Sequence, residues 1–193
     1  MMTKEEYIEF QKQIDSVYEK NRWLKVDGEV PDTVEITYGE ITRQGVSNLI
    51  LEFPKIFSDP NTVFYDIGCG YGNMVMHVAI SCPIKKAVGI EYIPERCQRA
   101  NDRAKKFKYL AEVEFQQGDV VDADFSDATV IYVDNTMPKM MDVVNNYIIP
   151  CLPDGCLILA RNFVTKYEHL REGQLVAPTT YNSNAKLRWG YKR

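Results

Sequence analysis

Histidine is nearly absent from this sequence, which has only two histidines, His77 and His169, among its 193 residues. Catalytic zinc sites and serine-type hydrolytic triads both depend on histidine side chains, so the sequence favours neither kind of site. His77 lies in the apolar stretch MVMHVAIS, which favours packing over catalysis or metal binding. No metal site is therefore expected.

Long apolar runs are also missing, because no stretch approaches the roughly 20 residues that a membrane span needs. The first ten residues, MMTKEEYIEF, lack the basic and then apolar pattern of a secretory signal. The five cysteines form no CxxC pair, which is typical of a reduced protein inside the cell. We expect an intracellular protein, in the cytoplasm or the nucleus, without a membrane partner.

A strongly basic field is absent as well, since the net charge is −4. Proteins that coat nucleic acid normally carry such a field. The last eight residues, KLRWGYKR, are an exception, with the basic side chains of Lys186, Arg188, Lys192 and Arg193. These side chains could contact DNA phosphate or an acidic protein patch; a solvated terminus is the alternative that this composition favours.

What is present is an alternation of helical and strand patterns, in a chain whose length is typical of one domain. Apolar periodicity predicts helices over residues 3–21 and 41–53. The later pattern predicts strands over 62–68, 86–91, 112–119, 128–135 and 156–163, with helices over 73–81 and 94–109. Strands that alternate with helices imply right-handed crossovers and a parallel sheet covered on both faces. We therefore expect a single α/β domain over 1–193, with N-terminal helices over 1–58 and the sheet over 60–193.

The stretch FYDIGCGYGN, residues 64–73, follows an apolar run with an acid and then with three alternating glycines. In open α/β sheets, ligands bind beyond the carboxyl ends of the strands, and glycine lets the backbone turn tightly and approach a ligand. A dinucleotide fingerprint reads G-x-G-x-x-G, but here Gly72 comes one residue too early and Asp66 precedes Gly68. A carboxylate at this position would repel a pyrophosphate and suits a cation such as S-adenosylmethionine, which carries an ammonium and a sulfonium. A plain strand-to-helix turn is the alternative.

Two more acids end the next two predicted strands. Glu91 closes VGIEY, where its carboxylate can accept hydrogen bonds from ribose hydroxyls, and Asp119 closes QQGDV, where it can accept one from an adenine amino group. A single acid at a strand end is most often a solvated residue or a helix cap. Three acids in succession, each one βα unit apart, favour a ligand site instead.

From about residue 60 to residue 163, the pattern resembles the class I S-adenosylmethionine-dependent methyltransferases. The resemblance implies a Rossmann-like α/β fold, with a mostly parallel, twisted sheet of about seven strands and helices on both faces. It also implies that S-adenosyl-L-methionine is the cofactor. By the same likeness, the cofactor-contact positions are Asp66, Gly68, Gly70, Glu91 and Asp119.

Upstream, the segment ITYGEITRQGV, residues 36–46, resembles the disruptor-of-telomeric-silencing family of histone H3 lysine methyltransferases, in a compact form limited to the catalytic domain. In that family the Tyr-Gly-Glu segment lies over the methionine end of the cofactor. The resemblance therefore implies that Tyr38 and Glu40 contact the cofactor and that Tyr38 is catalytic. Thr42 partly matches the family pattern after the acid and is expected in the substrate channel.

Further matches to this family lie in ATVIYVDNTMP, residues 128–138, and in ILARNF, residues 158–163. The family has an asparagine pair beside its lysine channel, where this chain has Asp134 and Asn135. We expect both to be catalytic, and Asp134 also to contact the cofactor and to accept the departing proton or hold the lysine ammonium. Tyr181 and Trp189 are candidates for the aromatic residues that close the channel; alternatively, they complete an antiparallel edge hairpin.

Together these features predict an S-adenosylmethionine-dependent N-methyltransferase that acts on protein lysine, with a histone, a nucleosome or another protein as substrate. Methyl transfer from a sulfonium mainly requires positioned reactants and the exclusion of water, so histidine is not needed. Two alternatives stay open. One is methylation of a small molecule or of RNA, and the other is a catalytically silent binding module on the same fold.

Overall fold

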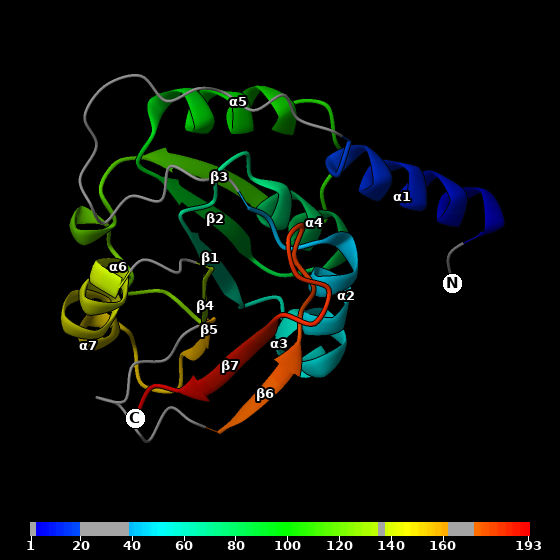
Figure 1. Ribbon diagram of the computed structural model, residues 1–193. Helices are drawn as coiled ribbons and strands as arrows, with labels where there is room; N and C mark the ends of the chain where they lie inside the picture. The colour runs from blue at the N-terminus through cyan, green and yellow to red at the C-terminus, as the bar shows by residue number, and fades with distance from the viewer. Residues whose placement is uncertain (1–2, 20–38, 135–137, 162–171) are drawn as a thin grey trace.

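A computed structural model describes residues 3–19, 39–134, 138–161 and 172–193, and Figure 1 shows their arrangement. Seven strands form one sheet in the order β3-β2-β1-β4-β5-β7-β6. The strands are β1 (Val63–Ile67), β2 (Lys86–Glu91), β3 (Glu112–Gln117), β4 (Val130–Val133), β5 (Leu157–Ala160), β6 (Gly173–Val176) and β7 (Lys186–Tyr191). The first five strands run parallel, whereas β7 pairs antiparallel with both β5 and β6. The predicted mostly parallel α/β sheet is confirmed.

The helices lie on both sides of this sheet (Figure 1). They are α1 (Lys4–Val17), α2 (Arg43–Glu52), α3 (Pro54–Phe57), α4 (Asn73–Ser81), α5 (Pro94–Ala104), α6 (Pro138–Val143) and α7 (Ile149–Cys151), with a 3₁₀ turn η1 (Val120–Asp122) and a π-helical turn η2 (Val144–Ile148). Helices α2, α3 and α4 pack on one face, while α6, η2 and α7 pack on the other. Within the described ranges, no helix is both long and apolar enough to cross a membrane.

Most predicted elements lie where the sequence pattern places them, and α4 and β2 have the predicted bounds. Helix α5 is shorter than the predicted 94–109 because the chain turns after Ala104 and reaches α4. There the backbone N–H of Leu110 donates to the Ala79 carbonyl at 2.9 Å. Pro54, two residues after the end of α2, begins the separate short helix α3, which fits the preference of proline for a first helical turn.

Strand β1 is buried along its whole length, as expected for a central strand of a sheet covered on both faces. Its side chains alternate between two apolar clusters. Phe64 packs with the helices α2 to α4, and Tyr65 packs with the α6 to α7 side. Full burial of such side chains contributes about 1.5–3 kcal/mol each. Dense packing on both sides therefore fixes the carboxyl end of β1, where Asp66 lies.

Helix α1 packs on α4 through a narrow apolar stripe. Its first turn is closed by a capping box in which Thr3 and Glu6 exchange hydrogen bonds with each other's backbone N–H. Ile14 and Val17 are buried against the α4 side chains of a third apolar cluster. This contact brings the C-terminal end of α1 close to the glycine segment that follows β1.

One arginine forms hydrogen bonds with α1, with the glycine segment that follows β1 and with the start of α4. Arg103, in the last turn of α5, donates from Nη1 to the Tyr71 carbonyl at 2.5 Å and to Asn73 Oδ1 at 2.7 Å. Its Nη2 donates to the Val17 carbonyl at the end of α1, at 2.5 Å. The guanidinium thus links α1, the glycine segment and the first residue of α4.

Replacing Arg103 by methionine should destabilise the fold strongly, since Met keeps the side-chain length but donates nothing. Hydrogen bonds from charged groups contribute about 1.5–3 kcal/mol each, so the free energy of unfolding should fall by about 3 kcal/mol or more. Urea denaturation measures this loss. Lys105→Met, an exposed change at the end of the same helix, should cost under about 1 kcal/mol. Equal losses for the two variants would contradict the role assigned to Arg103.

Candidate cofactor and acceptor site

Charged side chains gather where the five parallel strands end. Asp66 lies in β1, Glu91 ends β2, and Asp119, Asp134 and Arg161 follow β3, β4 and β5 directly or after one residue. Strand β1 pairs with β2 on one side and β4 on the other, so the strand order reverses there, which is where open α/β sheets bind ligands.

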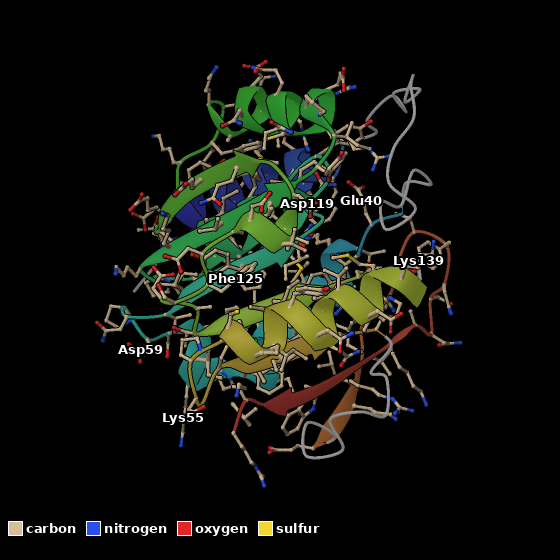
Figure 2. All side chains as sticks on the ribbon, turned by 90° about the vertical axis from the view of Figure 1, so that its left-hand side faces the viewer. Glu40, Lys55, Asp59, Asp119, Phe125 and Lys139 are labelled. Atoms are coloured by element: carbon tan, nitrogen blue, oxygen red, sulfur yellow. The ribbon has the colours of Figure 1, made fainter. Side chains whose placement is uncertain are left out.

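Other charged residues lie at the opposite end of the sheet, away from the carboxyl ends of the parallel strands. Figure 2 shows Glu40 and Asp119 toward one end of the sheet and Lys55 and Asp59 toward the other. The chain therefore brings Glu40, from the segment before α2, to the same end as the acids that follow the strands. The sequence prediction had placed Glu40 there only by resemblance.

The glycine segment turns sharply against β2. The backbone N–H groups of Gly68 and Cys69 both donate to the Ile90 carbonyl, at 2.9 and 3.0 Å. Gly68 has φ +76°, and a Cβ added there would meet no heavy atom within 4 Å, so this side of the segment is open. Gly72 also has φ +76°, but a Cβ there would lie 2.4 Å from the Phe115 ring. The two glycines thus differ, because Gly68 leaves room for a ligand and Gly72 allows packing on β3.

Glu91 holds this segment in place. Its Oε2 accepts from the backbone N–H of Gly70 at 2.8 Å, and its Oε1 accepts from that of Ile93 at 2.9 Å. The side chain is buried, and burial raises the pKa of Glu91 even though these two hydrogen bonds act to lower it. Each carboxylate oxygen has a second lone pair, so Glu91 can fix the glycine segment and still accept from a ligand hydroxyl.

Asp66 is an acidic residue in unfavourable surroundings for its negative charge. It is only 5% exposed. Burial raises the pKa of Asp66 well above its usual range, and the nearby carboxylates of Asp134, Glu91 and Glu40 raise it further. A buried group of acids with this mutual repulsion is stabilised by a cation. The site therefore fits the predicted cofactor, whose ammonium and sulfonium are both positive.

Asp119 lies half-buried at the end of β3, where its Oδ1 accepts from the backbone N–H of Val121 at 3.2 Å and caps the turn η1. Just before it, the N–H of Gly118 donates to the Glu91 carbonyl at 3.1 Å. These contacts place Asp119 on the strand next to Glu91, in agreement with a ligand that extends from β1 across β2 to β3.

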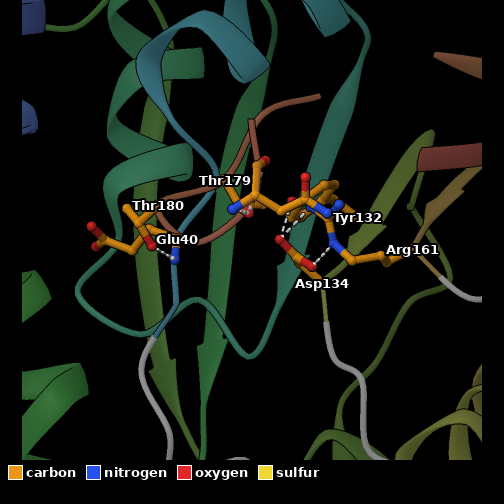
Figure 3. Close-up of polar contacts among 7 residues, drawn as sticks. Glu40, Tyr132, Asp134, Arg161, Thr179 and Thr180 are labelled. Atoms are coloured by element: carbon orange, nitrogen blue, oxygen red, sulfur yellow. Dashed lines mark hydrogen bonds and ion pairs between the residues drawn. The ribbon is translucent and has the colours of Figure 1, made fainter. Parts of the chain in front are cut away.

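The segment before α2 is bound to the C-terminal part of the chain. The Glu40 N–H donates to Thr180 Oγ1 at 3.2 Å, and the Thr180 N–H donates back to the Glu40 carbonyl at 2.8 Å (Figure 3). Glu40 Oε1 also accepts from the Asn73 side chain at 2.5 Å. Glu40 thereby connects α4 to residues 179–181. Tyr38, predicted to be catalytic and to contact the cofactor, lies outside the described residues.

Thr42, which was predicted to lie in the substrate channel, caps a helix. Its hydroxyl donates to the Pro178 carbonyl at 3.1 Å and accepts from the backbone N–H of Gly45 at 3.2 Å, so it caps α2. Both contacts fix the position of the segment that precedes α2, and the channel role of Thr42 stays a prediction. The threonine directly before a helical pattern was the available signal for this cap.

The two aromatic candidates lie in different surroundings. Tyr181 is 59% exposed, and its ring lies against Gly39, where an added Cβ would come within 2.5 Å of it. Trp189 instead packs into the apolar core, with its ring 5.3 Å from that of Phe53 in an edge-on contact. Trp189 therefore belongs to the antiparallel edge hairpin, and the channel role of both aromatic residues stays a prediction.

Asp134 is not a free base. Its Oδ1 and Oδ2 accept from Arg161 Nε and Nη2, the latter at 2.8 Å, and Oδ2 also accepts from the Tyr132 hydroxyl at 3.0 Å (Figure 3). The side chains of Asp134 and Arg161 are 13% and 9% exposed. Asp134 was predicted to accept the departing proton or to hold the lysine ammonium. The guanidinium of Arg161 offsets the negative charge that either role would use. Asn135 lies outside the described residues.

His77 packs in the core, as the sequence predicted. Its Nδ1 lies 2.9 Å from the Tyr18 hydroxyl, and burial, with a smaller effect of Arg43, lowers the pKa of His77 to about 4. The imidazole is therefore neutral at physiological pH and joins α1 to α4.

Three polar residues of the site escaped the sequence prediction, namely Asn73, Arg161 and Thr180. Each acts through a partner that is distant in the chain, so no local pattern marks it. For Arg161 a weak signal exists, because a cation directly follows the apolar strand LILA.

Comparisons with known proteins agree with this geometry. Residues 66–167, more than half of the chain, match the family described as the ANTKMT methyltransferase domain. A protein-lysine N-methyltransferase of Saccharolobus islandicus is 32% identical over 90 residues, which cover 47% of this chain and 55% of that protein. A carboxy-S-adenosyl-L-methionine synthase of Klebsiella pneumoniae is 28% identical over 138 residues, 66% of this chain and 56% of that protein. The chain thus spans about half the length of these curated relatives.

Solved structures support the fold. An RNA methyltransferase of Salinibacter ruber, in complex with S-adenosyl-L-homocysteine, has a TM-score of 0.65 and 24% identity, over 78% of this chain and 92% of that one. A methyltransferase of Geobacter sulfurreducens has a TM-score of 0.61 and 18% identity, over 80% and 82% of the two chains. With its matched family and its cluster of acids at the carboxyl ends of the parallel strands, the chain belongs to the ANTKMT methyltransferase domain family.

Proposed function

We propose that this methyltransferase transfers the methyl group to the side-chain amine of a protein lysine. The observation that carries the proposal is the placement of residues 39–42 beside the cofactor site, where Glu40 bridges Asn73 and Thr180. This is the segment that resembles the lysine methyltransferases. The Saccharolobus relative named above is a protein-lysine N-methyltransferase. A histone H3 lysine-79 methyltransferase of Gibberella zeae is also similar, at 27% identity over 49% of this chain and 19% of that protein.

In this proposal, S-adenosylmethionine supplies the electrophilic methyl group, and the chain supplies position and charge. Asp66 would offset the positive charge of the cofactor, Gly68 and Gly70 would let the backbone approach it, and Glu91 and Asp119 would accept hydrogen bonds from its hydroxyl and amino groups. Holding two reactants in line can contribute about 7–11 kcal/mol to lowering the barrier. No proton-transfer residue is required for the transfer itself.

The acceptor lysine must lose its proton before it can attack. With a reference pKa near 10.4, a neutral lysine amine at pH 7 costs about 4–5 kcal/mol. Desolvation against the Tyr181 ring and repulsion from the cofactor charge both lower the lysine pKa. Because Asp134 is paired with Arg161, we propose that the proton leaves to solvent beside the exposed Tyr181.

Cofactor affinity should depend on pH through Asp66. Its pKa is raised in the folded protein, so lowering the pH protonates Asp66 earlier than a solvated carboxylate and removes its attraction for the cofactor. We expect the affinity to fall as the pH decreases from neutral, and to fall at pH values that are still above about 4, the ordinary pKa of an aspartate. Isothermal titration at several pH values, with circular dichroism to verify folding, measures this. Affinity that is constant or rises on acidification would refute the assignment.

The acceptor is identified by mass spectrometry after incubation with cofactor and nucleosomes, free histones, a host lysate, RNA or a small-molecule extract. The proposal expects methylated lysine in at least one protein, and none with Asp66→Asn as the inactive control. Methylation only of RNA or of a small molecule would refute the lysine proposal and leave the methyltransferase intact. Cofactor binding without transfer to any of these would instead favour a silent binding module.

A further inference from the structure

A small pocket lies beside the Asp134–Arg161 pair, on the acceptor side of the site. Its volume is about 280 Å³. It is lined by Arg161, Gln174, Tyr181, Asn182, Ala185, Lys186 and Arg188. Three of these residues are cationic and none is acidic. Tyr181, the channel candidate, forms part of the wall, so the pocket adjoins the place proposed for the acceptor lysine.

The strand register brings two of the cations to one face and the third close to them in the backbone. Lys186 and Arg188 are two residues apart in β7, so their side chains point to the same face of the sheet. Arg188 is opposite Ala160 at the end of β5, and Arg161 is the next residue. On the other side, Arg188 is opposite Gln174 of β6. The antiparallel hairpin thus presents two cations next to a third that follows a parallel strand.

Arg161 gives a second and independent indication of a ligand. Its side chain is 9% exposed. Two of its nitrogens bind Asp134, but the buried Nη1 has no hydrogen-bond partner among the residues that the structure describes. A buried N–H group without an acceptor costs about 1–3 kcal/mol. An acceptor that enters the pocket would satisfy it.

We propose that this cationic pocket, formed by Arg161, Lys186 and Arg188, binds the carboxylate of an acidic residue close to the methylated lysine in the protein substrate. The inference rests on the proposed lysine specificity and adds a sequence preference to it. The carboxylate accepts a hydrogen bond from Arg161 Nη1 and pairs with the charges of Lys186 and Arg188. The methylation site then carries a lysine with an aspartate or glutamate nearby.

The charge around the pocket favours a single carboxylate over a nucleic acid. The carboxylates of Glu40, Asp66 and Glu91 lie close to one another and to Asp134, the partner of Arg161, so a phosphate backbone that reached the pocket would approach this group of negative charges. The whole chain has a net charge of −4. A peptide with a cationic lysine for the cleft and one acid for the pocket matches both regions.

The test uses random peptide pools centred on lysine, in which one flanking position is fixed as Asp or Glu, or as the uncharged Asn or Gln. We expect a KM about three- to tenfold lower for the acidic pools, which corresponds to the contribution of one or two partly exposed charge contacts. Arg188→Gln and Lys186→Gln should each reduce this preference and leave kcat and cofactor affinity unchanged. Lys192→Gln, whose side chain faces Asp154 outside the pocket, should keep the preference.

The outcomes separate the two proposals. Lysine methylation without preference for acidic pools, or with a preference that survives in both pocket variants, overturns the inference alone. No methylated lysine in any pool overturns the proposed function, and the subsite with it. RNA methylation that is lost in Arg188→Gln would assign the pocket to phosphate instead. Melting curves identify a variant that fails to fold, in which case the other pocket variant decides.

Discussion

Asp66→Asn is expected to abolish measurable binding of S-adenosylmethionine and, in the same protein, to raise the melting temperature of the ligand-free enzyme. Asparagine has nearly the same shape but no charge. Losing one partner of a buried charge pair costs about 2–5 kcal/mol, and 1.4 kcal/mol is a factor of ten. The affinity should therefore fall by about a hundredfold or more.

The gain in stability follows from the same buried charge. The folded-state pKa of Asp66 is raised, so its favourable contribution is complete below the unfolded pKa and is lost as the pH rises through the folded one. At neutral pH the charged form opposes folding, and Asn removes that cost. For a chain of this length each kcal/mol shifts the melting temperature by about 2–4 °C.

Calorimetric titration and thermal melts of the two proteins measure both effects. Asp59→Asn is the matched control, because Asp59 is exposed at the opposite end of the sheet and Asn can keep its hydrogen bonds to Asn61. It should change neither quantity. A variant Asp66→Asn that binds the cofactor normally would remove the electrostatic basis of the site.

The second large effect is expected for Arg161→Met, which leaves the largely buried carboxylate of Asp134 without a cationic partner beside Asp66. Breaking a buried ion pair by removing one partner costs about 3–5 kcal/mol. The melting temperature should fall by about 10 °C, at about 2–4 °C for each kcal/mol. Differential scanning calorimetry measures this.

Two controls separate charge from packing. The double variant with Asp134→Asn and Arg161→Met has no carboxylate without a cationic partner at this place, and its melting temperature should be much closer to that of the unchanged protein. Arg193→Met, which removes an exposed ion pair with Glu172, should cost under about 1 kcal/mol. A double variant no more stable than Arg161→Met alone would show that packing, and not charge, accounts for the effect.

The parallel half of the sheet could be predicted because each of its strands is a local signal. The buried run before Asp66 and the run that ends at Glu91 are continuous and mostly apolar, and the glycines that follow β1 mark the turn. The run that ends at Asp119 is largely polar, but its Val113 and Phe115 alternate with polar residues as in a partly buried strand. Strand order then follows from the handedness of the crossovers and from the resemblance to a known fold. The acids at the strand ends were found because their position is fixed by the strands themselves.

Other parts have no such local signal. The helical segment α6–η2–α7 carries prolines at 138 and 150 and adjacent asparagines at 145 and 146, which weaken a helical pattern. Packing of its apolar side chains on the sheet overrides this weak propensity. The pairing of Asp134 with Arg161 joins residues 27 positions apart, and only the parallel alignment of β4 and β5 brings them together. A role assigned to Asp134 from sequence could not include that partner.

The link between Glu40 and Thr180 joins residues 140 positions apart. The strands that carry the cofactor acids, β1 to β4, are contiguous in the chain and can pair while the nascent polypeptide is still growing. The hydrogen bonds that anchor Glu40 cannot form until Thr180 has been translated, and closing so long a loop carries an entropic cost that grows with its length. Folding should therefore proceed in two stages, in which the strands that carry the acids assemble before the segment that precedes α2 is fixed in place.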